Sequence, residues 1–197
     1  FDESRYFEPG TSLTVTSLAG ESIALSVCED VWNDKTYWAR PQYRFDPVED
    51  TMSSQPGILL INIAASPYSH GKGPMRQKML ANTARRYNSP ILYVNQVGGN
   101  DSLVFDGRSL AMNQKGELIS VAGTYHEQML VVDLNELSSA KPEPGGIEDT
   151  MDTMLGALST GLSDYMTKCR FKSCVLGLSG GIDSAVTAAI ACEAMDP

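Results

Sequence analysis

The 197-residue sequence predicts an α/β protein with two domains. Residues 57–65 and 90–97 are predominantly apolar, as in buried strands of a sheet that is covered on both faces. Near the far end of the chain, a glycine-rich turn separates an apolar run from an alanine-rich stretch. Strands that alternate with helical segments are typical of layered α/β domains.

The first part of the chain is rich in short β-type segments. Asp106-Gly107 predicts a two-residue hairpin between residues 103–105 and 108–110, and Lys115-Gly116 predicts a second turn. The predicted strands cover residues 13–16, 23–27, 58–64, 91–97, 103–105, 109–112, 118–121 and 129–133.

A helix is predicted between the two most apolar strands, over residues 74–87. Met75, Met79 and Leu80 recur with helical spacing and define its apolar side. Arg76 and Lys78 are expected near the other, polar side.

A change in composition marks the predicted domain boundary. Residues 138–146 are rich in Ser, Lys, Pro and Gly, which bury little surface and favour extended or turning backbone. We therefore assign residues 1–137 to the first domain, 138–146 to a linker and 147–197 to the start of a second domain. Within the second domain, residues 147–168 predict an amphipathic helix that leads into a strand at 174–177. The absence of an initial Met and the end just after the next helix suggest an internal fragment.

Composition limits the class of protein. A net charge of −9 and a pI near 4.6 argue against binding to nucleic acid or to an anionic membrane. The apolar runs are far shorter than the ~20 residues that span a bilayer. No paired-cysteine framework or leader is evident, so we expect a reducing, cytoplasmic setting.

The glycine-rich turn has the features of a phosphate-binding loop. Its glycines allow the backbone N–H groups to approach a ligand closely, and the following helix adds its positive end. No Lys-Ser or Lys-Thr pair follows, which excludes the usual nucleoside-triphosphatase loop. The pattern resembles the pyrophosphate loop of enzymes that cleave ATP between its α and β phosphates, in which Asp183 would help to hold Mg²⁺. The alternative is a plain strand-to-helix turn. The predicted ATP-binding residues are Gly177, Leu178, Ser179, Gly180, Gly181, Ile182, Asp183 and Ser184.

A second candidate site surrounds Cys28. This cysteine ends an apolar segment and precedes Glu29 and Asp30, so it is placed where a nucleophile can project from the edge of a sheet. A buried cysteine that acts as a small apolar residue is the alternative, and spacing alone does not separate the two.

Four segments together resemble the later part of a nitrilase-type glutaminase domain. They are Cys28-Glu29-Asp30, residues 62–68 with Gly71-Lys72 behind them, the opening residues 1–7, and residues 94–101 through 105–109. With the loop at 177–184, this order resembles the glutamine-dependent NAD synthetases over nearly the whole chain. The resemblance implies part of a nitrilase-like αββα sandwich, followed by the start of a Rossmann-like adenine-nucleotide α-hydrolase domain.

The resemblance also implies roles for single residues. Cys28 would be the nucleophile that attacks glutamine, and Glu29, Ser66 and Lys72 would hold the charged amino-acid end of that substrate. Glu3 matches an auxiliary carboxylate position, although an ordinary surface charge is an alternative for it, as a solvated loop lysine is for Lys72. The family's general-base Glu and catalytic Lys lie upstream of the segment that matches residues 1–7, so we expect this fragment alone to be inactive.

The implied reaction couples two steps. Ammonia released from glutamine would amidate deamido-NAD to NAD, after ATP and Mg²⁺ have adenylated its carboxylate, with AMP and pyrophosphate as by-products. A homo-oligomer is expected from the family. Two alternatives stay open: another ATP-pyrophosphatase amidotransferase, or a catalytically dead nitrilase-like binding scaffold.

Overall fold

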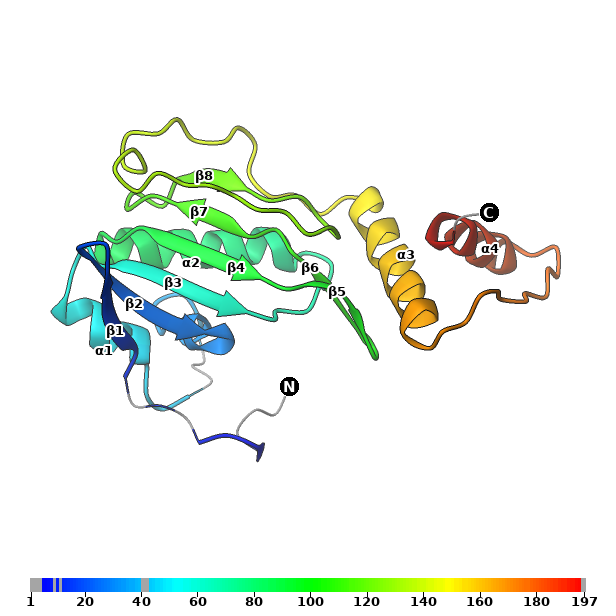
Figure 1. The fold of residues 1–197 in the computed structure, drawn as a ribbon, viewed down its shortest axis with the longest axis horizontal. Coiled ribbons are helices and arrows are strands. Elements are labelled where there is room, and N and C mark those ends of the chain that lie inside the picture. The colour runs from blue at the N-terminus through cyan, green and yellow to red at the C-terminus, as the bar shows by residue number, and fades with distance from the viewer. Residues whose placement is uncertain (1–4, 9, 11, 40–42, 196–197) are drawn as a thin grey trace.

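The computed structural model describes residues 5–8, 10, 12–39 and 43–195, so the predicted auxiliary carboxylate Glu3 lies outside the described residues. Its largest element is a six-stranded sheet in the order β1-β2-β3-β4-β7-β8 (Figure 1). The strands are β1 Thr14–Leu18, β2 Glu21–Val27, β3 Leu59–Ala64, β4 Ile91–Asn95, β7 Leu110–Met112 and β8 Leu118–Val121.

Three parallel strands form the centre of this sheet. β2 runs parallel to β3 and β3 parallel to β4, while β1, β7 and β8 pair antiparallel on the outside. The carboxyl ends of β2, β3 and β4 therefore lie at one edge, where the loops that follow them meet.

Two helices accompany the sheet. α2 Lys72–Tyr87 runs along the sheet (Figure 1), and its residues Met79 and Leu80 belong to the same buried cluster as Leu60 and Ile91. α1 Pro47–Ser54 was not predicted from the sequence. It begins after Asp46, whose carboxylate accepts a hydrogen bond from the Glu49 N–H at 3.0 Å, an ordinary N-cap.

The polar side of α2 was partly mispredicted. Arg76, expected near the polar side, is only 1% exposed, whereas Met75, expected on the apolar side, is 40% exposed. The reason is a buried carboxylate, that of Asp106, which accepts two hydrogen bonds from the Arg76 guanidinium in the interior.

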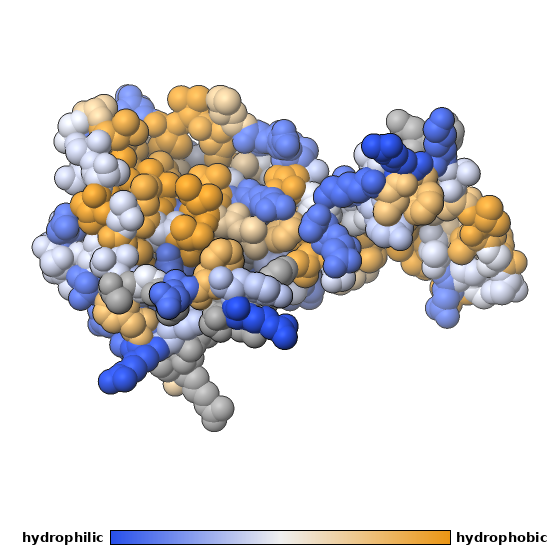
Figure 2. Space-filling model, turned by 60° about the horizontal axis from the view of Figure 1, so that its bottom comes forward, coloured by the Kyte–Doolittle hydropathy of each residue, from blue (hydrophilic) through white to orange (hydrophobic). Residues whose placement is uncertain are grey.

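One sheet face carries exposed apolar side chains. Val27, Ile63 and Val94 occupy corresponding positions on neighbouring strands and are 65%, 57% and 49% exposed. Figure 2 shows apolar side chains gathered over the lobe that holds the sheet.

A two-stranded ribbon links the sheet to the C-terminal helices. β5 Val97–Asn100 and β6 Leu103–Asp106 project from the sheet toward α3 Met151–Lys168, which also contacts α4 Ile182–Ala194 (Figure 1). The Gly99 N–H donates to Asp164 Oδ2 at 2.5 Å, and a Cβ at Gly99 would lie only 3.2 Å from the Gly161 Cα. Glycine at this position therefore allows the ribbon to pack closely on α3.

Some predicted β features are confirmed and others are wrong. The Lys115-Gly116 turn joins β7 and β8, with Gly116 at a φ of +72°. The Asp106-Gly107 hairpin does not form, because β6 pairs with β5 and the chain then crosses to β7. Residues 129–133 and 174–177, although predicted as strands, lack strand structure in the described chain.

None of the described helices has the length and hydropathy to cross a membrane.

Candidate active site

Cys28 lies at the carboxyl end of β2, where the backbone turns sharply. It begins the short 3₁₀ helix Cys28–Trp32 with a φ of +42°, in the left-handed region that non-glycine residues rarely adopt. The turn is fixed by Asp30, whose carboxylate accepts a hydrogen bond from the Val27 N–H at 2.7 Å. The half-buried thiol is thus presented by a constrained backbone, as is common for functional residues.

Ser66 follows β3 and therefore lies at the same edge of the sheet as Cys28. It is buried, and its N–H donates to Asn95 Oδ1 at 2.9 Å. Asn95 in turn donates to the Gly107 carbonyl at 3.0 Å and to Asp106 Oδ1 at 3.2 Å. Asn95 therefore fixes the loop that carries Ser66 to the chain that follows β6.

Lys72 is the first residue of α2 and is half-buried. Its Nζ donates to the Pro67 carbonyl at 3.0 Å and lies 5.3 Å from the centroid of the Trp32 ring. Burial lowers the pKa of Lys72 below its usual range, and the nearby Arg76 lowers it further, against the opposing effect of the Cys28 sulfur. Lys72 therefore lies within electrostatic reach of Cys28.

Glu29 places a carboxylate on the other side of Cys28 in the sequence. Its Oε2 accepts a hydrogen bond from the Tyr43 hydroxyl, and its charge opposes the lowering of the Lys72 pKa. Cys28, Glu29, Ser66 and Lys72, which the sequence analysis singled out, thus gather at one sheet edge and include both signs of charge. Their roles in catalysis and binding stay predictions.

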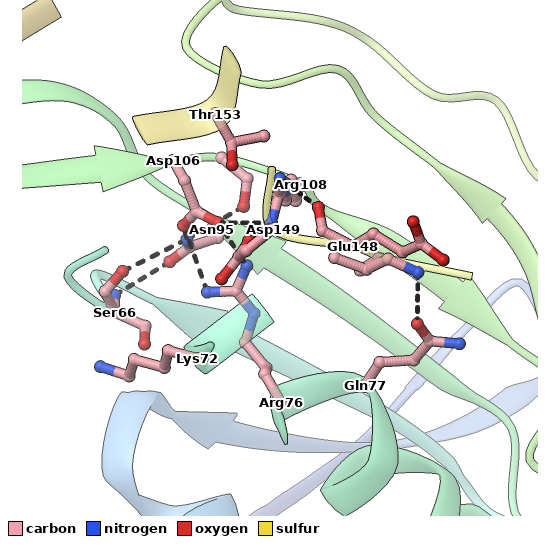
Figure 3. A network of polar contacts seen from close by, with 12 residues as sticks. Ser66, Lys72, Arg76, Gln77, Asn95, Asp106, Arg108, Glu148, Asp149 and Thr153 are labelled. Carbon is pink, nitrogen blue, oxygen red and sulfur yellow. Dashed lines mark hydrogen bonds and ion pairs between the residues drawn. The ribbon is translucent and has the colours of Figure 1, made fainter. Parts of the chain in front are cut away.

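A buried ionic network supports this edge (Figure 3). Arg76 pairs with Asp106 through two bonds of 3.0 and 3.3 Å, and both side chains are at most 2% exposed. Arg108 lies 3.8 Å from Asp106 and pairs with Asp149, in the segment before α3. This network was not predicted from the sequence, because Asp106 was assigned to a two-residue hairpin turn and Arg108 to the strand after it.

The predicted nucleotide loop is shaped by its own side chains. The Ser184 hydroxyl donates to the Gly181 carbonyl at 2.9 Å, accepts from the Ser179 N–H at 3.3 Å, and lies 3.1 Å from the Ser179 hydroxyl. Gly180 has a φ of +84°, which glycine adopts without strain. Asp183 lies in the first turn of α4, and residues 177–183 are exposed.

The two candidate sites are distinct from a cavity of about 420 Å³ that lies at the opposite edge of the sheet. Gly20, Gln55 and Pro90 are among its lining residues, which surround the amino ends of the strands. Within the described ranges, three or more His, Cys, Asp or Glu side chains do not gather anywhere in a way that could hold a metal ion.

Comparison with known proteins identifies both parts of the chain. Residues 1–141 match the carbon-nitrogen hydrolase family, and residues 154–197 match NAD synthase. The glutamine-dependent NAD(+) synthetase of Synechocystis sp. is 41% identical over 200 residues, which cover 99% of this chain and 35% of that protein. The chain thus spans about a third of the length of the curated relatives it matches.

Solved structures agree with this assignment. The glutamine-dependent NAD+ synthetase from Acinetobacter baumannii, solved in complex with ADP, is similar with a TM-score of 0.83 and 33% identity, over 98% of this chain and 35% of that one. An amidase from Nesterenkonia sp. AN1, 20% identical, shares the fold over 62% of this chain and 42% of its own, with a TM-score of 0.50. The chain belongs to the carbon-nitrogen hydrolase family, with a partly nitrilase-like fold, and is a homologue of glutamine-dependent NAD(+) synthetases that extends into their NAD synthase region.

Proposed function

We propose that the protein makes NAD from deamido-NAD with nitrogen taken from glutamine, and that Cys28 is the nucleophile that releases this nitrogen. The observation that carries the proposal is the position of Cys28, on a constrained turn at the end of β2 with Lys72 and Glu29 in electrostatic reach. A thiolate is a strong nucleophile toward an amide carbonyl.

The first half-reaction follows from this arrangement. The Cys28 sulfur attacks the side-chain carbonyl carbon of glutamine, the carbon–nitrogen bond breaks, and ammonia leaves with an added proton. Water then hydrolyses the thioester to glutamate and restores the thiol. The proton transfers are not assigned to any side chain of this sequence.

Three further residues suit the amino-acid end of glutamine. The substrate carries an ammonium and a carboxylate, and it therefore needs partners of both signs. The Glu29 carboxylate suits the ammonium, while the Lys72 ammonium and Ser66 suit the carboxylate. Because Lys72 is half-buried, its ion pair with the substrate is screened less than a surface pair would be.

The loop at residues 177–184 suits the phosphates of ATP. Its glycine backbone and the N-terminus of α4 present N–H groups to an anion. The exposed Asp183 carboxylate offers the oxygen ligands that Mg²⁺ prefers. When bound, ATP would supply an adenylyl group that turns the deamido-NAD carboxylate into a mixed anhydride, from which ammonia displaces AMP.

The test uses the full-length protein with ATP, Mg²⁺ and deamido-NAD, supplied with either glutamine or ammonium. Cys28→Ala is expected to lose glutamine-supported NAD formation by more than about 10³-fold, the scale of losing a covalent nucleophile, and to retain ammonium-supported formation. Cys169→Ala, which changes an exposed cysteine, is the matched control and should retain both.

Equal glutamine-supported activity in Cys28→Ala and the unmodified protein would remove Cys28 from the mechanism. A protein that forms no NAD from either nitrogen source would favour the binding-scaffold alternative. A homo-oligomeric state and a cytoplasmic location stay predictions from the family resemblance.

A further inference from the structure

Helix α2 lacks a local side-chain cap at the end that carries Lys72. Its N-cap residue is Gly71, which has no side chain and a φ of +85°, and the first turn contains no acidic residue. The Gly71 N–H instead donates to Asp149 Oδ2 at 2.7 Å, from a residue 78 positions further along the chain. A distant carboxylate therefore takes the place that a nearby Asp or Glu usually fills.

Asp149 is itself held firmly. Its other oxygen, Oδ1, pairs with Arg108 Nη1, and Arg108 Nη2 donates to the Glu148 carbonyl at 3.0 Å. The side chains of Arg108 and Asp149 are only 5% and 2% exposed. These groups form a buried ion pair, which water screens less than it screens an ion pair on the surface.

The fit between α2 and the Asp149 segment requires a glycine at position 73. A Cβ on Gly73 would lie 2.4 Å from Arg108 Nη1 and 3.0 Å from both Asp149 Oδ1 and the Ile147 side chain. One turn further along, Gln77 Oε1 accepts a hydrogen bond from the Ile147 N–H at 2.7 Å. Figure 3 shows this segment lying beside the start of α2.

Charge gives a reason for this contact. Lys72, Arg76 and Arg108 place three cations near the N-terminus of α2, where the helix dipole is also positive. Asp106 and Asp149 are the carboxylates paired with the two arginines. Removing Asp149 would leave Arg108 without its nearest carboxylate and the Gly71 N–H without its side-chain acceptor.

We infer that Asp149 is a positioning residue for glutamine binding: it fixes the backbone at Gly71 and thereby the placement of the adjacent Lys72. The inference rests on the proposed role of Lys72. Asp149 lies two residues before α3, most of which falls in the region that matches NAD synthase. The proposed glutamine site is therefore anchored to the segment that precedes the region matching NAD synthase.

The experiment compares Asp149→Ala and Asp149→Asn with Asp152→Ala in the full-length protein. Asp152 is an exposed carboxylate three residues away and serves as the matched control. Loss of a cap and a charged hydrogen bond predicts a rise of about 5- to 30-fold in the KM for glutamine in Asp149→Ala. Asp149→Asn, which can still accept from the Gly71 N–H, should show a smaller rise of about 2- to 5-fold.

Ammonium-supported NAD formation should stay within about 2-fold in all three variants, because it does not use Lys72. Faster hydrogen–deuterium exchange in residues 69–75 of Asp149→Ala provides a second readout that is independent of turnover.

Two outcomes would overturn the inference: a KM for glutamine in Asp149→Ala equal to that of Asp152→Ala, or a parallel loss of ammonium-supported activity. The second outcome would show a general structural role. Failure of the proposed function looks different, since the unmodified protein would then form no NAD from glutamine, and the inference would fall with it.

Discussion

The site around Cys28 is held together by contacts between distant segments, whereas the loop at residues 177–184 is shaped by bonds among its own members. Ser66 bonds to Asn95, 29 residues away, and Gly71 bonds to Asp149, 78 residues away. In the loop, Ser179 and Ser184 are only five residues apart. The first site therefore depends on the whole fold, while the second carries its shape in a short sequence.

Burial shows the same contrast. Arg76 and Asp106 are almost fully buried beneath the first site, but α4, which follows the loop, has no buried residue among those described. A substitution near Cys28 is expected to change both stability and chemistry. A substitution in the loop is expected to change ligand binding with little effect on the stability of the fold.

The largest stability effect is expected from Arg76→Met. This change leaves the Asp106 carboxylate buried without its bidentate partner and should cost about 3–5 kcal/mol in the free energy of unfolding. Lys78→Met alters an exposed cation on the same helix and should change it by less than about 0.5 kcal/mol. Denaturant titration measures both, and equal effects would show that the buried network does not stabilise the first site.

An intermediate effect is expected from adding one methyl group in each region. Gly73→Ala places a Cβ against Arg108 and Asp149, and this overpacking, ~1–3 kcal/mol, should outweigh the higher helix propensity of alanine. Gly177→Ala meets no atom within 4 Å and should change stability by less than about 0.5 kcal/mol. Thermal unfolding of both variants tests the contrast, and a stabilised Gly73→Ala would contradict it.

The smallest effect concerns pH. Because burial and Arg76 lower the pKa of Lys72, its charge is lost at a lower pH than that of an ordinary lysine. The glutamine affinity that depends on this charge should be complete below the shifted pKa and should fall as the pH rises through it. Steady-state measurements across the alkaline range, below the usual lysine pKa of 10.5, should show a rising KM for glutamine.

Lys72→Arg is the control for this pH dependence, because arginine stays charged throughout that range. Its KM should follow only the titration of the substrate's own amino group. Identical pH profiles for the two proteins would exclude Lys72 as a ligand of the glutamine carboxylate.

Much of the fold was predictable, because its main signals are local. The apolar segments that form β3 and β4, and the helical period of α2, depend on neighbouring residues alone. α1 was missed because its buried apolar side chains are only Val48 and Met52, although Asp46 and Pro47 carry an N-terminal capping signal.

The supporting network could not be predicted in this way. Asp106-Gly107 has the composition of a tight turn, but the Asp106 side chain is recruited by Arg76 from another element. Likewise, nothing near Asp149 in the sequence indicates that it caps a helix 78 residues earlier. The roles of Cys28, Glu29, Ser66 and Lys72 were predicted by family resemblance, and the groups that hold these residues in place required the structure.

The most direct test of the account follows the nitrogen atom. The full-length protein is supplied with glutamine that carries ¹⁵N in its side-chain amide, together with ATP, Mg²⁺ and deamido-NAD, and the NAD product is analysed by mass spectrometry. We expect the unmodified protein to form NAD that carries the label. Cys28→Ser is expected to form no labelled NAD from glutamine, and to form it only when ¹⁵N-ammonium is supplied. Labelled NAD formed equally well from glutamine by Cys28→Ser would contradict the account.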